Sequence, residues 1–265
     1  MKMKKLVSFI GIGSLLLFAA CASKPLAPPK GVKGRNFSSY APLGLVMVVS
    51  NADVNWVGEQ TFQTQNSSIS DFVRNTLGLR KGEDLVTFTM AEDLVNDADS
   101  ILRKVLTDAE VFRLADKEQT LVGVNTVMAK KKSAKMPSGT IAAQGYRYLN
   151  YKDKQLVADF AREAGVKSLL YVTFEFNKEL ISGFAKTGKA RSRVVMDAAL
   201  VNSAGKVLYH DQIEAFGSDR ITVTTGAYAQ DELIDTVKEA IGEVCYRYIW
   251  KFDGTSNLIP LIGKP

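Results

Sequence analysis

His210 is the only histidine of the chain, and a neutral imidazole can act as a general base or as a metal ligand. It stands in Tyr209-His210-Asp211, inside a run of residues typical of a strand. Neighbouring residues of a strand point to opposite faces, so Asp211 is not expected to orient the ring. A single imidazole also cannot assemble a zinc hydrolase site. The pattern favours a histidine on a strand surface over a catalytic one, and no metal site is expected.

Phosphate-binding glycine motifs do not occur after any predicted strand. The nearest sequence, GFAKTG at 183–188, lacks the closing Lys-Ser or Lys-Thr pair of a P-loop. Paired carboxylates, Glu92-Asp93 and Asp97 with Asp99, fall on a predicted helix and are interpreted as its solvated face. We therefore expect no catalytic residues and a protein that is not an enzyme.

The segment Asn51–Glu59 (NADVNWVGE) directly follows a predicted buried strand. In open α/β sheets, ligands bind in the crevice beyond the carboxyl ends of the strands. Trp56 offers a flat face for stacking, and hydrogen bonds are available from Asn51, Asn55 and Glu59. The segment is therefore a candidate ligand or partner contact. The alternative is that Trp56 folds back and plugs the end of the sheet.

A lysine run forms a second candidate surface. It consists of Lys130, Lys131, Lys132 and Lys135. With Pro137 and Gly139 behind it, the segment 130–139 repels itself and is interpreted as a mobile loop. The run is either a solvated loop or a contact for anionic lipid headgroups.

The N-terminus carries the three parts of an export signal. Lysines open it, an apolar stretch runs from Leu6 to Phe18, and Ala19-Ala20 precede Cys21. The apolar stretch of about 13 residues is shorter than the roughly 20 that a membrane-spanning helix needs. The sequence ending at Cys21 resembles the bacterial lipobox, with Phe18 in place of the usual leucine. The alternative is an ordinary secretory signal that contains a cysteine.

The lipobox resemblance implies cleavage before Cys21, a diacylglycerol thioether on its sulfur and an acylated amino group. Several acyl chains together anchor a protein stably. Ala22, where inner-membrane lipoproteins often carry Asp, implies an outer-membrane location, and we expect the domain to face the periplasm. Residues 1–20 are then the signal peptide, 21–39 the lipidated anchor and linker, and 40–265 a single domain. Apart from the covalent lipid, no cofactor is expected.

Without residues 1–20 the formal net charge falls from +6 to +3, because three lysines and no acids leave with them. Such a mild charge is not that of a nucleic-acid-binding polycation, so no nucleic acid partner is expected. Once Cys21 is lipidated, Cys245 is the one remaining thiol and no intramolecular disulfide can form. It shares a helix side with Ile241 and Tyr248, so we expect it to be buried as a small apolar residue.

Hydrophobic periodicity predicts strands and helices that alternate along the chain. Strands are expected at 43–49, 111–114, 121–128 and 168–176, and a hairpin at 193–201 and 206–216. Helices are expected at 69–77, 90–106, 156–164 and 231–252. A capping box at Thr89–Glu92 is expected to open the second helix. The alternation predicts an α/β (α+β) fold, a single mixed β-sheet with helices packed on it.

Three segments resemble consecutive parts of a known α/β domain. They are LRKVLTDAEVFRL (102–114), FAREAGVKSLLYVT (160–173) and VVMDAALVNSAGKVLY (194–209). In order, they resemble the helix-to-strand step, the next helix–strand step and the hairpin of CsgG-like or TolB-N-terminal-like domains of envelope lipoproteins. The lipobox, the element order and the apolar helix stripes are also similar to spirochaetal outer-membrane lipoproteins whose amphipathic helices enter the membrane.

Two hypotheses from different classes follow. The first is a non-enzymatic lipoprotein that serves as a periplasmic assembly, transport or structural factor, through another envelope protein or anionic lipid. The second is a membrane-active outer-membrane lipoprotein that inserts amphipathic helices and alters permeability. A hydrolase whose site the sequence does not reveal is a third. Liposome leakage separates the first two hypotheses, because a scaffold leaves vesicles intact.

Overall fold

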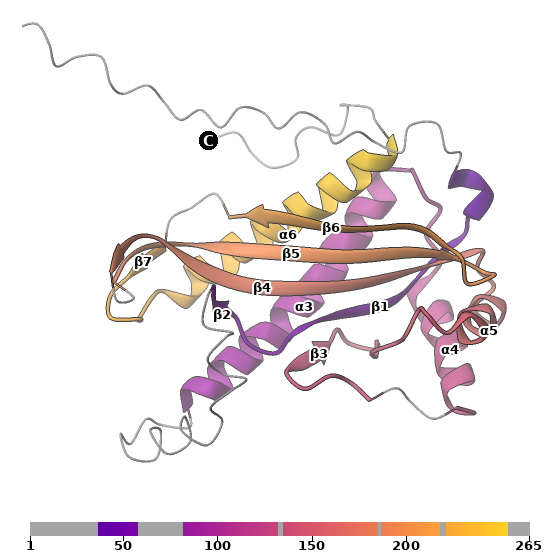
Figure 1. Cartoon of the computed structure of the whole chain (residues 1–265), viewed down its shortest axis with the longest axis horizontal. Coiled ribbons are helices and arrows are strands. Elements are labelled where there is room, and N and C mark those ends of the chain that lie inside the picture. The colour runs from indigo at the N-terminus through magenta and orange to yellow at the C-terminus, as the bar shows by residue number, and fades with distance from the viewer. Residues whose placement is uncertain (1–36, 58–81, 132–134, 185–186, 218–220, 254–265) are drawn as a thin grey trace, which may run out of the picture.

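The computed structural model describes residues 37–57, 82–131, 135–184, 187–217 and 221–253, which build one mixed sheet with helices on both faces (Figure 1). The predicted α/β fold is thereby confirmed. Five strands form a path across the sheet, β3 (Thr140–Ala142), β1 (Leu43–Asn51), β4 (Ser168–Phe184), β5 (Thr187–Asn202) and β6 (Val207–Phe216). Two short strands complete it, β2 (Asn55–Trp56) on β4 and β7 (Ile221–Val223) on β5. The helices are η1 (Phe37–Tyr40, a 3-10 helix), α3 (Gly82–Asp108), α4 (Lys117–Met128), α5 (Lys154–Ala164) and α6 (Gln230–Asp253).

Strand β1 runs parallel to β4, and the chain between them passes through α3, α4 and α5. The pairs β4–β5, β5–β6 and β1–β3 are antiparallel, so the sheet is mixed. Eight of the nine residues of β1 are buried, which confirms the expected strand covered on both faces. A break in register between Leu45 and Met47 gives β1 a bulge on the β4 side.

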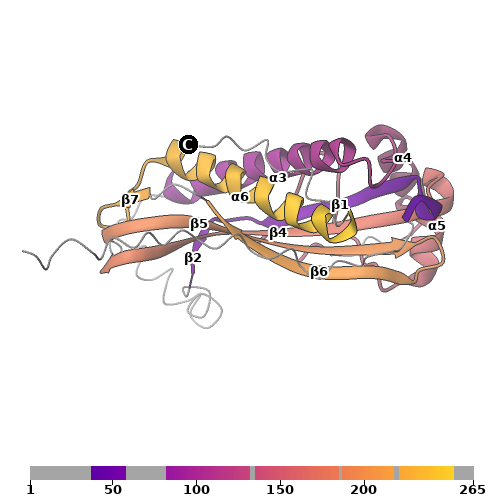
Figure 2. The ribbon, with the colours of Figure 1, turned by 90° about the horizontal axis from the view of Figure 1, so that it is seen from above.

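Alternate residues of β4 and β5 enter two separate hydrophobic cores, one on each face of the sheet. On one face, Phe174, Phe176 and Met196 pack with α3 and α6. On the opposite face, Leu169, Tyr171 and Val201 pack with α4 and α5. Figure 2 shows that α3 and α6 lie along the length of the sheet, whereas α5 covers only one end.

Beyond the second core, the face opposite α3 and α6 carries polar side chains. Arg191 of β5 pairs with Glu179 of β4, and Arg193 pairs with Glu214 of β6 at 2.5 Å. The guanidinium carbon of Arg191 also lies 3.6 Å from the centre of the Phe216 ring. Opposite charges on neighbouring strands therefore line this part of the sheet.

The expected strand at 121–128 is wrong, because this segment is the C-terminal two thirds of helix α4. Its β-branched residues suggested a strand, yet Val124, Val127 and Met128 are buried with Thr120 and Gly123 at helical spacing. The Asp116 side chain caps the helix by accepting from the Gln119 N–H. Burial of one helical face therefore outweighs strand propensity here.

Two further expectations at α3 need correction. The helix begins at Gly82, so the proposed capping box at Thr89–Glu92 lies inside it. Residues 82–88 contain no proline, so the helix can continue through them on the N-terminal side of the proposed box. The expected strand at 111–114 is reduced to a single bridge between Leu114 and Leu43. The expected helix at 69–77 lies outside the described residues.

The remaining elements agree with the sequence pattern. Helix α5 ends at Gly165, whose φ of 67° is the left-handed conformation expected of a C-cap glycine. Strands β5 and β6 form the predicted hairpin, and α6 covers the predicted range 231–252. Strand β4 is longer than expected, because it continues through Phe184 and pairs with β5 almost to the turn.

Strand β6 forms one edge of the sheet, and side chains of the same protein bond to its backbone. The Gln212 N–H donates to Asp211 Oδ1 at 3.0 Å, and Arg247 of α6 donates to the Glu214 carbonyl at 2.7 Å. Asp211 in turn accepts from the Tyr209 hydroxyl at 2.7 Å and forms an ion pair with Lys251. These bonds occupy backbone groups that an edge strand otherwise leaves open.

Candidate functional site

Asn51, at the end of β1, uses its side-chain amide to extend the sheet. Its Nδ2 donates to the Phe176 carbonyl at 2.8 Å, and its Oδ1 accepts from the Phe176 N–H at 2.7 Å. The amide thus reproduces the paired bonds of a strand. The same Nδ2 also donates to the Asp53 carbonyl, inside the turn that leads to β2. Asn51 therefore joins β1 to β4, and a ligand role for it stays a prediction.

Trp56, in β2, lies beside a buried lysine of β4. Lys178 is 6% exposed, and its ammonium group donates to the Val54 carbonyl. The ammonium nitrogen lies 5.3 Å from the centre of the Trp56 ring and 5.1 Å from that of Tyr228, as in cation–π contacts. The Trp56 ring also packs against the larger core. Trp56 is thus half-buried at the margin of β4, and a ligand role for it stays a prediction.

The candidate contact at Asn51–Glu59 is described only in part. Asn55 pairs with Asn177 of β4 and lies next to Trp56 along that strand. Glu59 lies outside the described residues, as do Cys21 and Lys132. The structure thus brings Asn51, Asn55 and Trp56 to one margin of β4.

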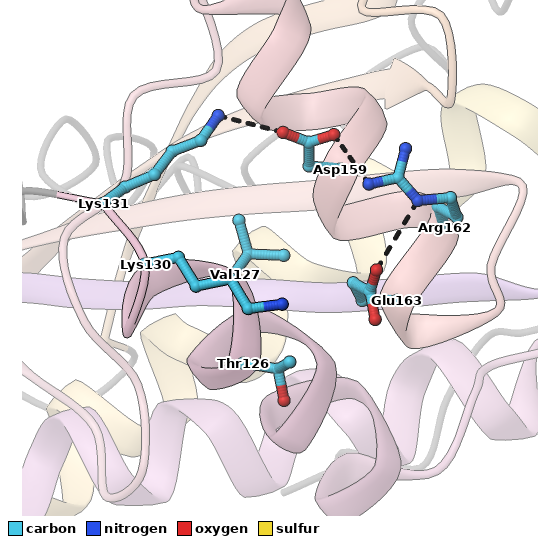
Figure 3. A pocket seen from close by; sticks show the side chains of 7 residues that line it. All are labelled: Thr126, Val127, Lys130, Lys131, Asp159, Arg162 and Glu163. Carbon is cyan, nitrogen blue, oxygen red and sulfur yellow. Dashed lines mark hydrogen bonds and ion pairs between the residues drawn. The ribbon is translucent and has the colours of Figure 1, made fainter.

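Two lysines of the run at 130–135 line a small hollow between α4 and α5 (Figure 3). Lys131 forms an ion pair with Asp159 at 2.9 Å, and Arg162 bonds to the same carboxylate at 2.9 Å. The Lys131 ammonium lowers the pKa of the Asp159 carboxyl, an effect to which Arg162 adds and which desolvation opposes. Lys130 is exposed at the rim, and Lys135 is exposed beyond the gap in the described chain.

The volume of this hollow is about 80 Å³. Sites for organic ligands usually enclose several hundred Å³. The hollow therefore has room for a few water molecules but not for a cofactor. Its carboxylates, Asp159 and Glu163, are both within ion-pair distance of Arg162. Contact of the lysine run with an anionic surface stays a prediction.

His210 lies on the exposed side of β6, as the sequence predicted. Its Nε2 lies 3.0 Å from Oδ1 of Asp197, which stands across the hairpin on β5. Asp211 points elsewhere, to Tyr209 and Lys251. Sequence reasoning missed Asp197 as the partner, because only the pairing register of β5 and β6 brings the two side chains together. Among the described residues, no group of three His, Cys, Asp or Glu side chains gathers as a metal site would require.

Asp99 is buried, which corrects its interpretation as part of a solvated helix face. Its side chain is 4% exposed and accepts from Arg103 Nε at 3.0 Å and from Lys117 Nζ at 2.6 Å. The Tyr146 hydroxyl donates to the same carboxylate at 2.8 Å and accepts from Arg103. We call these four residues the Asp99 cluster. They join α3 to the start of α4 and to the turn before α5.

Burial raises the pKa of the Tyr146 phenol above its ordinary value, and the nearby Asp99 carboxylate adds to this effect. The phenol therefore stays neutral and keeps its role as donor to Asp99. Burial also raises the pKa of the Cys245 thiol, which is free and fully covered. Because the thiolate is the reactive form, Cys245 is inert in the folded protein. Its predicted burial is confirmed.

Comparison with known proteins assigns no family. No protein-family model matches the chain, and no curated protein matches it either. Within the described residues, no helix is long and apolar enough to cross a membrane.

Proposed function

We propose that this chain is a lipid-anchored envelope lipoprotein whose domain works by binding, as a periplasmic assembly, transport or structural factor. The observation that carries the proposal is the export signal ending in Ala19-Ala20-Cys21. Lipid on Cys21 would hold the domain at a membrane, and Ala22 favours the outer membrane. Membrane lipid is then its first partner, with another envelope protein or anionic lipid as the second.

A binding role is supported by the contacts of the side chains that could otherwise be reactive. The His210 ring is bonded to Asp197 on an exposed strand face, and the Cys245 thiol is covered by core residues. The Asp99 carboxylate is held by three donors that link separate segments. Each of these groups serves packing or pairing, which leaves surface contact as the activity that the geometry favours.

Metabolic labelling with palmitate tests the anchor directly. We expect label on the wild-type protein and recovery in the membrane fraction. The variant Cys21→Ser should carry no label and be released from the membrane, because the thiol is the acyl acceptor. The variant Cys245→Ala is the matched control, since it removes the other cysteine and should remain labelled. Label on Cys21→Ser, or none on the wild type, would overturn the proposal.

The membrane-active alternative requires an amphipathic helix to expose its apolar face to lipid. The apolar face of α5, formed by Leu156, Val157, Phe160, Ala161 and Ala164, is buried against the sheet. Insertion into a bilayer would have to expose this face and open the second core. Leakage of dye from liposomes by the acyl-free chain would favour this alternative over a scaffold, and intact vesicles would count against it.

A further inference from the structure

Four exposed lysines from three separate segments lie at one end of the domain. Lys152 and Lys154 stand at the start of α5, Lys167 precedes β4, and Lys206 follows the turn between β5 and β6. We call them the lysine end. Figures 1 and 2 both place α5 and the β5–β6 turn at the same end of the sheet, opposite the β4–β5 turn.

Backbone contacts fix these segments side by side. The Ser203 N–H, in the β5–β6 turn, donates to the Lys167 carbonyl at 3.0 Å. Gly205 of the same turn touches Lys154 so closely that an added Cβ would lie 2.7 Å from the Lys154 Cβ. Gly205 also has a φ of 73°, a conformation that glycine adopts most readily. The turn therefore holds Lys206 next to the start of α5.

The ammonium groups of the lysine end have no ion-pair partner within the described parts of the chain. Acids are present nearby, but two of them act as helix caps. Asp153 Oδ1 accepts from the Leu156 N–H at 3.0 Å, and Asp116 Oδ1 accepts from the Gln119 N–H at 2.9 Å. The four lysine side chains are exposed to solvent.

The helices α3 and α6, which cover one face of the sheet, carry a net negative charge. Residues 90–108 of α3 and 230–252 of α6 together carry ten carboxylates, of which Asp99 is buried and paired, and five basic groups. The domain is therefore polarised, with acidic helices along one face and lysines gathered at one end. An approaching anionic surface would be attracted to the lysine end and repelled by the helical layer.

The chain that leads back toward Cys21 leaves the described domain at this same end. The Lys167 N–H donates to the Pro42 carbonyl at 3.0 Å, and Ser168 Oγ donates to the Tyr40 carbonyl at 2.8 Å. Helix η1, which contains Tyr40, lies at the same end of the sheet as α5 and the β5–β6 turn in both views of the fold (Figures 1 and 2).

We propose that the lysine end docks on anionic lipid headgroups of the membrane in which Cys21 is anchored. The proposal rests on the lipid anchor for its setting, but the affinity of this surface for anionic lipid does not need the acyl chains. Docking would fix the orientation of the domain, with the turn between β4 and β5 directed away from the membrane. Each lysine near an anionic surface contributes about a fivefold gain in partition.

Vesicle sedimentation of the mature chain without acyl groups (residues 22–265) tests this docking. The probes are vesicles of phosphatidylglycerol with phosphatidylcholine, and neutral vesicles of phosphatidylcholine alone. We expect binding to the anionic vesicles only. Binding should weaken as salt rises from about 0.1 M to about 1 M, because the screening length falls from about 10 Å to about 3 Å.

Two quadruple variants with the same loss of charge locate the contact. One replaces Lys152, Lys154, Lys167 and Lys206 by Gln, and the other replaces Lys130, Lys131, Lys132 and Lys135 by Gln. We expect the first variant to lose binding by about a hundredfold or more and the second to lose less than about tenfold, given about fivefold for each lysine in contact. Unchanged circular dichroism would confirm that both variants fold.

Equal losses in the two variants would show a general charge effect and overturn the proposal. A larger loss in the second variant would assign the contact to the lysine run instead, and a lack of binding to either vesicle would exclude lipid as the partner of this surface. Palmitate labelling is measured separately. A labelled wild-type protein without vesicle selectivity would leave the lipoprotein proposal standing and remove only this inference.

Discussion

The Asp99 cluster and the lysine end both gather charges from distant parts of the sequence, yet they differ in how those charges are satisfied. In the Asp99 cluster, one buried carboxylate accepts from Arg103, Lys117 and Tyr146. At the lysine end, four exposed ammonium groups face solvent. A buried charge destabilises the fold unless it is paired, whereas an exposed charge loses little by remaining alone. Pairing therefore marks the charges that hold the fold, and exposure marks those open to a partner.

The largest effect is expected from Asp99→Ala. This change leaves Arg103 and Lys117 without their shared partner, and we expect the free energy of unfolding to fall by about 3 kcal/mol. Urea denaturation measures the loss. The control is Asp108→Ala, which removes the exposed ion pair of Lys104 and should cost less than about 1 kcal/mol. Similar losses in the two variants would remove the distinction between buried and exposed charges.

Removal of single hydroxyl groups sharpens the same contrast within buried residues. Tyr146→Phe deletes a hydroxyl that bonds to both Asp99 and Arg103, and we expect a loss of about 1 to 2 kcal/mol. Tyr171 is also buried, even more completely than Tyr146, but within the described residues its hydroxyl has no hydrogen-bond partner. Tyr171→Phe should therefore leave the stability unchanged or raise it slightly, as thermal denaturation can measure. A greater loss for Tyr171→Phe would contradict the assignment.

Alkaline pH should weaken the Asp99 cluster gradually. The pKa of Tyr146 is raised in the folded protein, so its neutral form contributes fully to stability below about pH 10, the value of an unfolded tyrosine. That contribution is lost as the pH rises from there toward the folded pKa. Between about pH 9 and about pH 11, we expect the wild type to lose about 1 kcal/mol more than Tyr146→Phe. Parallel curves from urea denaturation would show that Tyr146 does not titrate differently on unfolding.

The smallest stability effect is expected at the lysine end itself. Replacement of Lys152, Lys154, Lys167 or Lys206 by Gln should change the free energy of unfolding by less than about 0.5 kcal/mol each, since these side chains are exposed. Thermal denaturation checks this result. A substantial loss at any of these positions would mean that the lysine side chain stabilises the fold, which would contradict its assignment as a free surface charge.

Local patterns in the sequence are sufficient to predict the elements that depend on residues nearby in the chain. The apolar run in β1, the C-cap at Gly165 and the β5–β6 hairpin each depend on a few neighbouring residues. The segment 121–128 was assigned wrongly because its valines suit a strand. Its helical state depends on close packing with α5, where Gly123 touches the backbone of Ala164.

The charged groups could not be predicted in the same way. Asp93 and Asp99 are the same residue type on the same helix, yet Asp93 is exposed and Asp99 is buried. The partners of Asp99, Lys117 and Tyr146, come from other segments that the fold brings in. The lysine end likewise depends on the β5–β6 turn, whose Ser203 N–H bonds to the Lys167 carbonyl. By contrast, the run at 130–135 is obvious in the sequence, yet one of its members, Lys131, is paired with Asp159.

The bonded edge of β6 has a consequence for molecules held close together. A protein confined to a surface meets its own copies at high local concentration, and an open strand edge would let one sheet continue into the next. Here a second copy would have to displace Arg247 from the Glu214 carbonyl and Asp211 from the Gln212 N–H. Crowded copies should therefore remain separate at this edge, and association between them would have to use side chains in place of backbone pairing.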